Sequence, residues 1–83
     1  MSWNMTNKEK AFRKQIRNTI GSNIRSMRKA AGMTQIELAK KIDKSEPQIV
    51  KWENGKTDIK VADMLILLDL FKSDMTLDEF AGR

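Results

Sequence analysis

The sequence predicts an all-α fold in a single small domain, and three features of the chain indicate it. No segment alternates apolar and polar residues with the period of two that half-buried strands show. The 83 residues include one proline, Pro47. Beyond residue 31, three segments carry Ser or Thr followed three residues later by Glu or Gln, which is the signature of a helix N-terminus. A chain of this length builds one small core, so we expect most of its apolar positions to lie inside.

The first helix is predicted from about residue 7 to Ala31, and Gly32 supplies its end. Its apolar residues recur at spacings of three and four and form one face: Phe12, Ile16, Ile20, Ile24, Met27 and Ala31. Gly21 costs about 1 kcal/mol relative to alanine inside a helix, so a break within residues 18–22 stays open. The basic segment 1–18 is either a helical extension or a mobile arm, and the periodicity favours a helix. Residues 19–83 are expected to form the domain.

Three more helices are marked by N-terminal caps, in the segments TQIE (34–37), SEPQ (45–48) and TLDE (76–79). In such a capping box the hydroxyl and the Glu or Gln side chain each accept a hydrogen bond from a backbone amide of the other residue. The caps predict helices over about residues 35–42 and 46–54 and a short one after Thr76. A further helix over about 60–71 is the most apolar segment and is expected to line the core, which makes five in total.

The helices over 35–42 and 46–54 are joined by only two or three residues around Asp43. A connection this short forces the two helices to cross steeply, as in a helix-turn-helix. Asp43 stands where the turn needs a left-handed backbone, which aspartate tolerates better than most residues. Ile49 and Trp52 fall on one face of the second helix, so we interpret Trp52 as a core residue and not as a platform for stacking bases.

The charge is distributed unevenly along the chain, whose net charge is +5. Residues 1–31 hold eight basic and one acidic residue, whereas residues 57–83 hold three basic and six acidic residues. This polarity favours a basic face for a polyanion such as nucleic acid. A generic basic protein is the alternative, and Arg13, Lys14 and Arg17 are either a solvated helix face or contacts to phosphates.

Several classes of function are disfavoured by what the sequence omits. It contains no histidine and no cysteine, so the usual zinc sites and His-dependent nucleophiles have nothing to be built from. The acidic residues are too dispersed to predict a metal site. We therefore expect no enzymatic activity and no cofactor. The longest apolar run, MLILL at 64–68, is far shorter than the roughly 20 residues that span a bilayer. No signal peptide is visible, so a soluble cytoplasmic protein is expected.

The segment GMTQIELAKKIDKSEPQIVKWENGK, residues 32–56, resembles the helix-turn-helix core of the phage repressor and Cro-like family, also called the XRE type. The matching signals are Thr34-Gln35, Leu38-Ala39, Ser45, Ile49 and Trp52-Glu53-x-Gly55. The resemblance covers about residues 20–80. It implies a compact five-helix domain like that of lambda repressor, in which the third helix enters the major groove of DNA. The sequence departs from the family pattern at Asp43, which replaces a turn glycine.

The resemblance also implies roles for individual residues. Base-reading positions at the start of the third helix are Glu46, Pro47, Gln48 and Lys51. Phosphate-contacting positions are Gln35, Asn54, Gly55 and Lys56. Arg28 and Glu53 correspond to a structural ion pair between the first and third helices. For Glu46 two interpretations stay open: it stabilises the positive end of the helix dipole, or it accepts a hydrogen bond from a cytosine amino group.

These observations favour a sequence-specific, double-stranded DNA-binding transcriptional regulator, a repressor acting in the cytoplasm at the nucleoid. One module of this size covers a half-site, so we expect a homodimer on a palindromic operator. The C-terminal helices or the extended first helix would supply its interface. The alternative is an antitoxin or adaptor that uses the same fold to bind another protein, with the basic extension, Trp3 and Phe12 as its contact segment.

Overall fold

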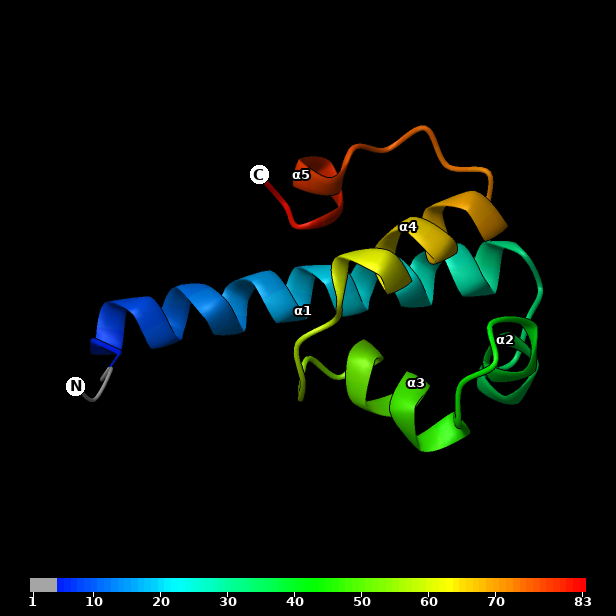
Figure 1. Cartoon of the computed structure of the whole chain (residues 1–83), viewed down its shortest axis with the longest axis horizontal. Coiled ribbons are helices and arrows are strands. Elements are labelled where there is room, and N and C mark those ends of the chain that lie inside the picture. Colours follow the sequence, from blue (N-terminus) through cyan, green and yellow to red (C-terminus); the bar gives the residue numbers. More distant parts are fainter. Residues whose placement is uncertain (1–4) are drawn as a thin grey trace.

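The computed structural model describes residues 5–83, and the regular secondary structure of these residues is entirely helical. Trp3 lies outside the described residues. The five helices are α1 (Asn7–Ala30), α2 (Gln35–Lys41), α3 (Glu46–Glu53), α4 (Val61–Leu70) and α5 (Leu77–Phe80). The all-α prediction and the number of helices are therefore confirmed. In Figure 1, α1 forms the long axis, α2 and α3 lie below it, α4 crosses in front of it, and α5 lies above.

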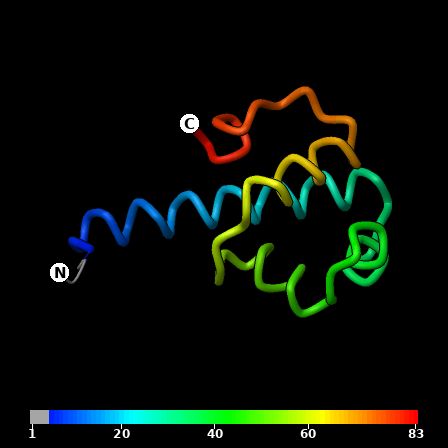
Figure 2. The backbone as a smooth tube through the Cα atoms, in the orientation of Figure 1, coloured from blue at the N-terminus to red at the C-terminus, as the bar shows by residue number. Residues whose placement is uncertain are grey.

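The first helix runs without interruption for 24 residues, so the break that was left open within residues 18–22 does not occur. Thr6 and Glu9 cap its N-terminus reciprocally: the Glu9 amide donates to Thr6 Oγ1 (3.1 Å) and the Thr6 amide donates to Glu9 Oε1 (3.4 Å). The N-terminal turns of α1 project beyond the other helices, as the backbone in Figure 2 shows. The basic extension is therefore helical from Asn7 onward.

Gly21 lies where α1 passes the end of α3. A Cβ atom at this position would lie 2.7 Å from the carbonyl oxygen of Glu53 and even closer to that of Trp52. Since both neighbours are backbone atoms of a packed helix, neither can move aside cheaply. The glycine therefore does not break the helix; it lets the two helices approach closely.

The predicted capping boxes form completely at Thr34–Glu37 and Thr76–Glu79. At Ser45 only half of the box is present: the Gln48 amide donates to Ser45 Oγ (3.3 Å), and no reciprocal bond to the Gln48 side chain occurs within residues 5–83. The prediction of a full box there is wrong. The complete boxes use a carboxylate, which the positive end of the helix attracts, whereas the neutral amide of Gln48 lacks that attraction.

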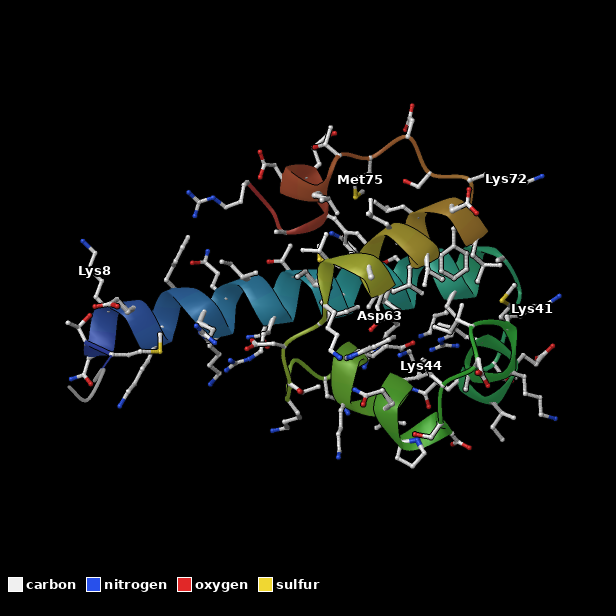
Figure 3. The ribbon with its side chains drawn as sticks, viewed as in Figure 1. Lys8, Lys41, Lys44, Asp63, Lys72 and Met75 are labelled. Atoms are coloured by element: carbon white, nitrogen blue, oxygen red, sulfur yellow. The ribbon has the colours of Figure 1, made fainter. Side chains whose placement is uncertain are left out.

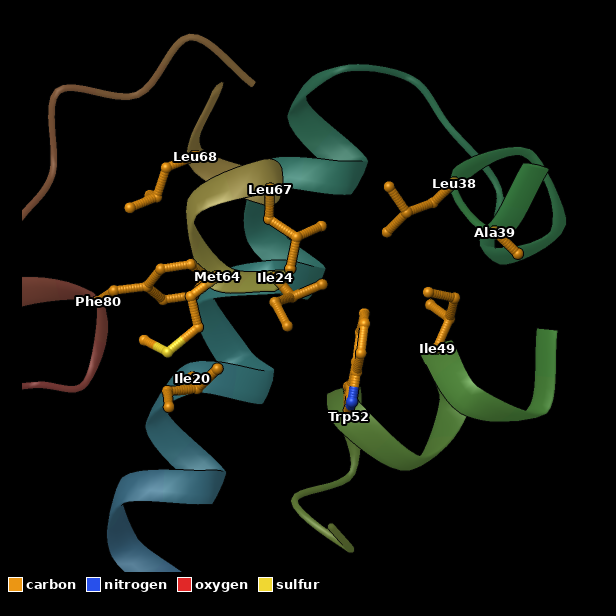
Figure 4. Packing of buried hydrophobic residues seen from close by; sticks show 10 residues of the cluster. All are labelled: Ile20, Ile24, Leu38, Ala39, Ile49, Trp52, Met64, Leu67, Leu68 and Phe80. Atoms are coloured by element: carbon orange, nitrogen blue, oxygen red, sulfur yellow. The ribbon is translucent and has the colours of Figure 1, made fainter. Parts of the chain in front are cut away.

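All five helices contribute to one core, shown in Figure 4. Its buried members are Ile20, Ile24, Leu38, Ala39, Ile49, Trp52, Met64, Leu67, Leu68 and Phe80. Trp52 is 4% exposed, which confirms its prediction as a core residue. Phe80 anchors α5, and the Asn23 side chain of α1 donates to its carbonyl oxygen (2.9 Å).

Most apolar side chains of the described residues lie in the core or pack against it, as expected, but five large ones are exposed. They are Phe12, Ile36, Val61, Leu65 and Ile66. Three of them belong to α4, which is apolar around most of its circumference but packs through one side only. The other side of α4 is left facing outward.

Candidate nucleic-acid interface

The turn between α2 and α3 fixes the angle between the two helices. Asp43 adopts a left-handed backbone (φ 55°), as its place in the sequence predicted, and the Lys44 amide donates to the Ala39 carbonyl (2.9 Å). Lys44 Nζ also lies 3.3 Å from Asp63 Oδ1, which ties the turn to α4 (Figure 3). Close packing at this crossing is possible because Ala39 is small and buried.

The third helix buries one face and presents its N-terminal edge to solvent. Ile49, Trp52 and Glu53 are buried. None of the four residues predicted to read bases is buried: Glu46, Pro47 and Lys51 are exposed, and Gln48 is half-buried. Pro47 lies in the first turn, where its missing amide donor interrupts no helical hydrogen bond.

Within residues 5–83, the side chains of Glu46, Gln48 and Lys51 form no hydrogen bond or ion pair. We call Glu46, Pro47, Gln48 and Lys51 the α3 edge. Its polar groups are therefore available to another molecule without breaking an internal contact first.

A polar network anchored on Glu53 holds this helix in position. The Arg28 guanidinium binds the carboxylate through two bonds, from Nε to Oε2 (2.7 Å) and from Nη2 to Oε1 (3.0 Å). Gln35 Nε2 (3.2 Å) and Arg25 Nε (3.4 Å) donate to the same Oε1. Three side chains from α1 and α2 thus converge on one buried carboxylate of α3 through four hydrogen bonds, which sets the rotation of α3 about its axis.

The protonation of this pair follows from its surroundings. Burial by itself raises the pKa of Glu53, but the hydrogen bonds from Arg28, Gln35 and Arg25 and the positive charge of Arg28 outweigh burial, so the pKa of Glu53 is lowered. The hydrogen bond to Glu53 raises the pKa of Arg28. Both groups are therefore charged throughout the neutral range.

The residues predicted to contact phosphates gather at two places. Gln35 opens α2, and its side chain is directed inward to Glu53. Asn54, Gly55 and Lys56 follow α3 directly, and Lys56 is exposed. Gly55 adopts a positive φ of 66° and its Cβ position is filled by Asn18, so only glycine fits there.

The contacts of Arg25 with Glu53 and Asn54 were not predicted from the sequence. Arg25 Nη2 donates to Asn54 Oδ1 (3.0 Å), in addition to the bond from Nε to Glu53. Arg25 lies one turn before Arg28 on α1, and this i, i+3 spacing to the expected ion-pair partner was the signal that could have found it.

The arginines of the extension contact the loop after α3. Arg13 Nη1 lies 2.8 Å from Asp58 Oδ2 and Arg17 Nη1 lies 3.4 Å from Asp58 Oδ1. Arg17 Nε also donates to the Gly55 carbonyl (3.3 Å). Lys14 is exposed and forms no ion pair within the described residues. Neither of the two interpretations of this basic segment included the pairing with Asp58.

Among residues 5–83, no three His, Cys, Asp or Glu side chains gather in a group that could hold a metal ion. No helix in this part of the chain is long and apolar enough to cross a membrane.

The segment that contains the α2–α3 turn matches a known protein family. The helix-turn-helix family model matches residues 24–79, which is more than half of the chain and includes all of α2, α3 and α4. No curated protein and no solved structure matches the chain. The matched range, the α2–α3 turn and the all-helical architecture agree with one another. The chain therefore belongs to the DNA-binding helix-turn-helix family of the phage repressor and Cro-like (XRE) type.

Proposed function

We propose that the protein is a sequence-specific transcriptional regulator, a repressor, that reads the major groove of double-stranded DNA with α3. The observation that carries this proposal is the α3 edge on a helix anchored through Glu53. Its Glu46 and Lys51 side chains are exposed, and its polar side chains are unpaired within the described residues. The N-terminal residues of a recognition helix reach base edges first. Glu46, Pro47, Gln48 and Lys51 are accordingly the residues proposed to select the sequence.

The proposed phosphate contacts are Gln35, Asn54, the Gly55 amide and Lys56. A hydrogen bond from Arg25 orients Asn54 for such a contact. A guanidinium can only donate hydrogen bonds, so Asn54 presents Oδ1 to it and keeps Nδ2 free to donate to a phosphate oxygen. Such contacts position a protein on the duplex without reading its sequence.

The proposed DNA-binding domain is residues 19–83, with residues 1–18 as its extension. A module of this size covers one half-site, so the proposal includes a homodimer on a palindromic operator, with half-sites about 34–36 Å apart. A regulator of this kind acts at the nucleoid, in the cytoplasm.

Selection of binding sites from random double-stranded DNA tests this proposal. We expect enrichment of a short palindromic motif, and we expect the triple variant Glu46→Ala, Gln48→Ala, Lys51→Ala to lose the enrichment while it keeps weak binding at low salt. Failure of the natural sequence to enrich any motif, at low and moderate salt, would overturn the proposal.

A protein-interaction module is the second candidate, and one observation favours it. Phe12 is 45% exposed and borders a surface groove of about 540 Å³ between the extension and the 58–59 segment. The guanidinium of Arg83 covers one face of its ring, with Cζ 4.5 Å from the ring centroid. If selection enriches no motif and Phe12→Ser abolishes a stoichiometric complex with a purified partner, the second candidate replaces the first.

A further inference from the structure

The acidic residue in the first turn of α4 is used differently from those of three other helices. In α1, α2 and α5 the third residue is a glutamate, whose carboxylate accepts a hydrogen bond from the N-cap amide of its own helix. Asp63 is the third residue of α4, but it accepts no such bond within residues 5–83. Its Oδ1 lies 3.3 Å from Lys44 Nζ instead. Asp63 therefore contacts the α2–α3 turn and does not cap its own helix.

The pair is largely shielded from solvent. The Asp63 side chain is 12% exposed and the Lys44 side chain is 35% exposed, whereas the side chains of Arg13 and Asp58 are both more than half exposed. A carboxylate that has lost most of its water needs a positive partner. In the part of the chain that the structure describes, Lys44 is the one cation within ion-pair distance of Asp63. Removal of either charge therefore leaves the other without its partner.

Lys44 directly precedes the end of α3 that is proposed to read bases. Ser45 is the N-cap, and Glu46 and Pro47 are the first two residues of the helix. At its other end α3 is held by the network on Glu53. The N-terminal end has only half of a capping box. In Figure 3, Lys44 and Asp63 meet between the turn and α4, so their contact is a further restraint on this less constrained end.

We propose that the Lys44–Asp63 pair positions the N-terminal end of α3 for base reading. Asp63 of α4 then contributes to sequence discrimination although it is not part of the α3 edge. The inference deepens the proposed function and rests on it wherever DNA is the readout. Hydrogen bonds to base edges weaken steeply when donor and acceptor are misaligned. A small displacement of Glu46 and Pro47 should therefore reduce discrimination and leave the phosphate contacts of residues 54–56 in place.

Two single variants separate positioning from a general attraction to DNA. Lys44→Met and Asp63→Asn each remove the ion pair with little change of shape, and they change the net charge in opposite directions. An effect of net charge alone would weaken binding of the first variant to all DNA and strengthen that of the second. Positioning predicts the same result for both: the ratio of the affinities for the selected site and for random DNA should fall about tenfold.

The double variant Lys44→Met, Asp63→Asn has the natural net charge. It should lose no more discrimination than either single variant, because all three lack the same contact. Lys41→Met and Asp69→Asn are the matched controls. They make the same charge changes at exposed residues of α2 and α4 that form no ion pair within the described residues. Both controls should keep the natural ratio.

The ratio is measured under conditions in which urea unfolding shows each variant to be fully folded. A pair that only stabilises the domain would lower the unfolding midpoint and leave the discrimination of the folded protein unchanged. That result would overturn the inference, and so would opposite effects of Lys44→Met and Asp63→Asn on the ratio.

Spectra of the free protein, with backbone amides labelled by ¹⁵N, supply a readout without DNA. Asp63→Asn should shift the amide signals of Glu46 and Gln48, which belong to another helix, and leave that of Glu53 in place. Unchanged signals of Glu46 and Gln48 would overturn the inference. If the natural chain selects no motif, the proposed function fails and base reading by α3 fails with it. If the chain selects a motif that both variants read equally well, only the inference about the pair is overturned.

Discussion

Gly21 of α1 lies directly against the backbone carbonyl of Trp52 at the end of α3. The neighbouring Glu53 carbonyl is 2.7 Å from the place that a Cβ of residue 21 would take. The contact joins the helix that carries the basic extension to the helix that carries the α3 edge. It is backbone to backbone, so no rotamer change can relieve an added methyl group.

Gly21→Ala is therefore expected to destabilise the domain, although alanine is the better helix former by about 1 kcal/mol. The clash forces α1 and α3 apart and should outweigh this gain, leaving a net loss of about 1–3 kcal/mol. Thermal or urea unfolding followed by circular dichroism measures the difference. Ser22→Ala is the control: the residue is exposed on the same helix, so that variant should be at least as stable as the natural sequence.

The case of Gly21 shows what the sequence could and could not predict about this fold. Helix boundaries depend on local chemistry, such as the hydroxyl of Thr34 and the left-handed turn at Asp43, and these were predicted correctly. The need for a glycine at residue 21 comes from a contact with residues 52 and 53, about thirty positions away. Apolar periodicity carries no information on such a contact, so a break at the glycine stayed open.

In the candidate site, too, the features set by local sequence were predictable and those set by long-range contacts were not. The segment 45–56 could be assigned as a docked helix with an exposed edge, because burial and exposure alternate with the helical period there. The bonds of Arg25 to Asn54 and of Arg13 to Asp58 join residues 29 and 45 positions apart. They depend on how the helices cross, which periodicity does not determine. The exposed side of α4 was not predicted, because an apolar sequence does not show which side of its helix the other helices will cover.

The Arg28–Glu53 pair predicts how stability depends on pH. The pKa of Glu53 is lowered in the folded state. A carboxyl group with a lowered pKa adds stability that is fully present above its unfolded value, here 4.5, and is lost as the pH falls below that value. Glu37 and Glu79, whose pKa values are lowered by hydrogen bonds with Thr34 and Thr76, act in the same direction. Urea unfolding should thus show stability falling as the pH is lowered below 4.5.

Substitutions of Arg28 and Glu53 separate the contribution of this pair to the pH dependence of stability from that of the capping residues Glu37 and Glu79. Glu53→Gln leaves Arg28 buried without a counter-charge and should cost about 3 kcal/mol at neutral pH. The double variant Arg28→Met, Glu53→Leu should recover most of this loss and show a weaker acid dependence, with only the caps left to titrate. An acid dependence equal to that of the natural sequence would mean that the pair contributes nothing to it.

Lys51 and Lys56 carry the same charge but have different proposed roles, so they form a matched pair. Lys51→Ala should cost about 1–3 kcal/mol at one base position and relax the preference there, while other sequences are bound almost as before. Lys56→Ala should weaken binding to all sequences alike and reduce the slope of log K against log salt by about 1. Titration of the selected site and its single-base variants at several salt concentrations measures both. A uniform loss for Lys51→Ala would exclude base reading by that residue.

Glu46 distinguishes two uses of a carboxylate at a helix N-terminus. If it accepts a hydrogen bond from a cytosine amino group, Glu46→Gln should change the preferred base at one position in a repeated selection. If it serves only the helix dipole, the preferred site should stay the same, stability should fall by about 0.3–1 kcal/mol, and binding to random DNA should rise as a negative charge is removed. The selected motif either changes or stays the same, so the repeated selection decides between the two interpretations.

Removal of the Asp58 carboxylate is expected to free the guanidinium groups of Arg13 and Arg17 for contact with DNA. This carboxylate pairs with Arg13 and Arg17 beside the proposed phosphate contacts at Asn54–Lys56, and the Asp58 and Arg13 side chains are more than half exposed. Exposed pairs of this kind add about 0–1 kcal/mol to stability, so Asp58→Asn should leave the unfolding midpoint almost unchanged. Binding to random DNA at low salt should become tighter, and the slope of log K against log salt steeper by about 1–2, if the freed arginines reach phosphates.

Asp74→Asn supplies the comparison, because it removes the same charge from an exposed residue between α4 and α5. Both variants raise the net charge equally, so a general attraction to DNA would strengthen their binding equally. A local release of Arg13 and Arg17 would strengthen only Asp58→Asn, and adding Arg13→Gln and Arg17→Gln to it would cancel the gain. Equal binding by the two single variants would assign the basic extension to the solvated surface and leave DNA contact to the domain that follows it.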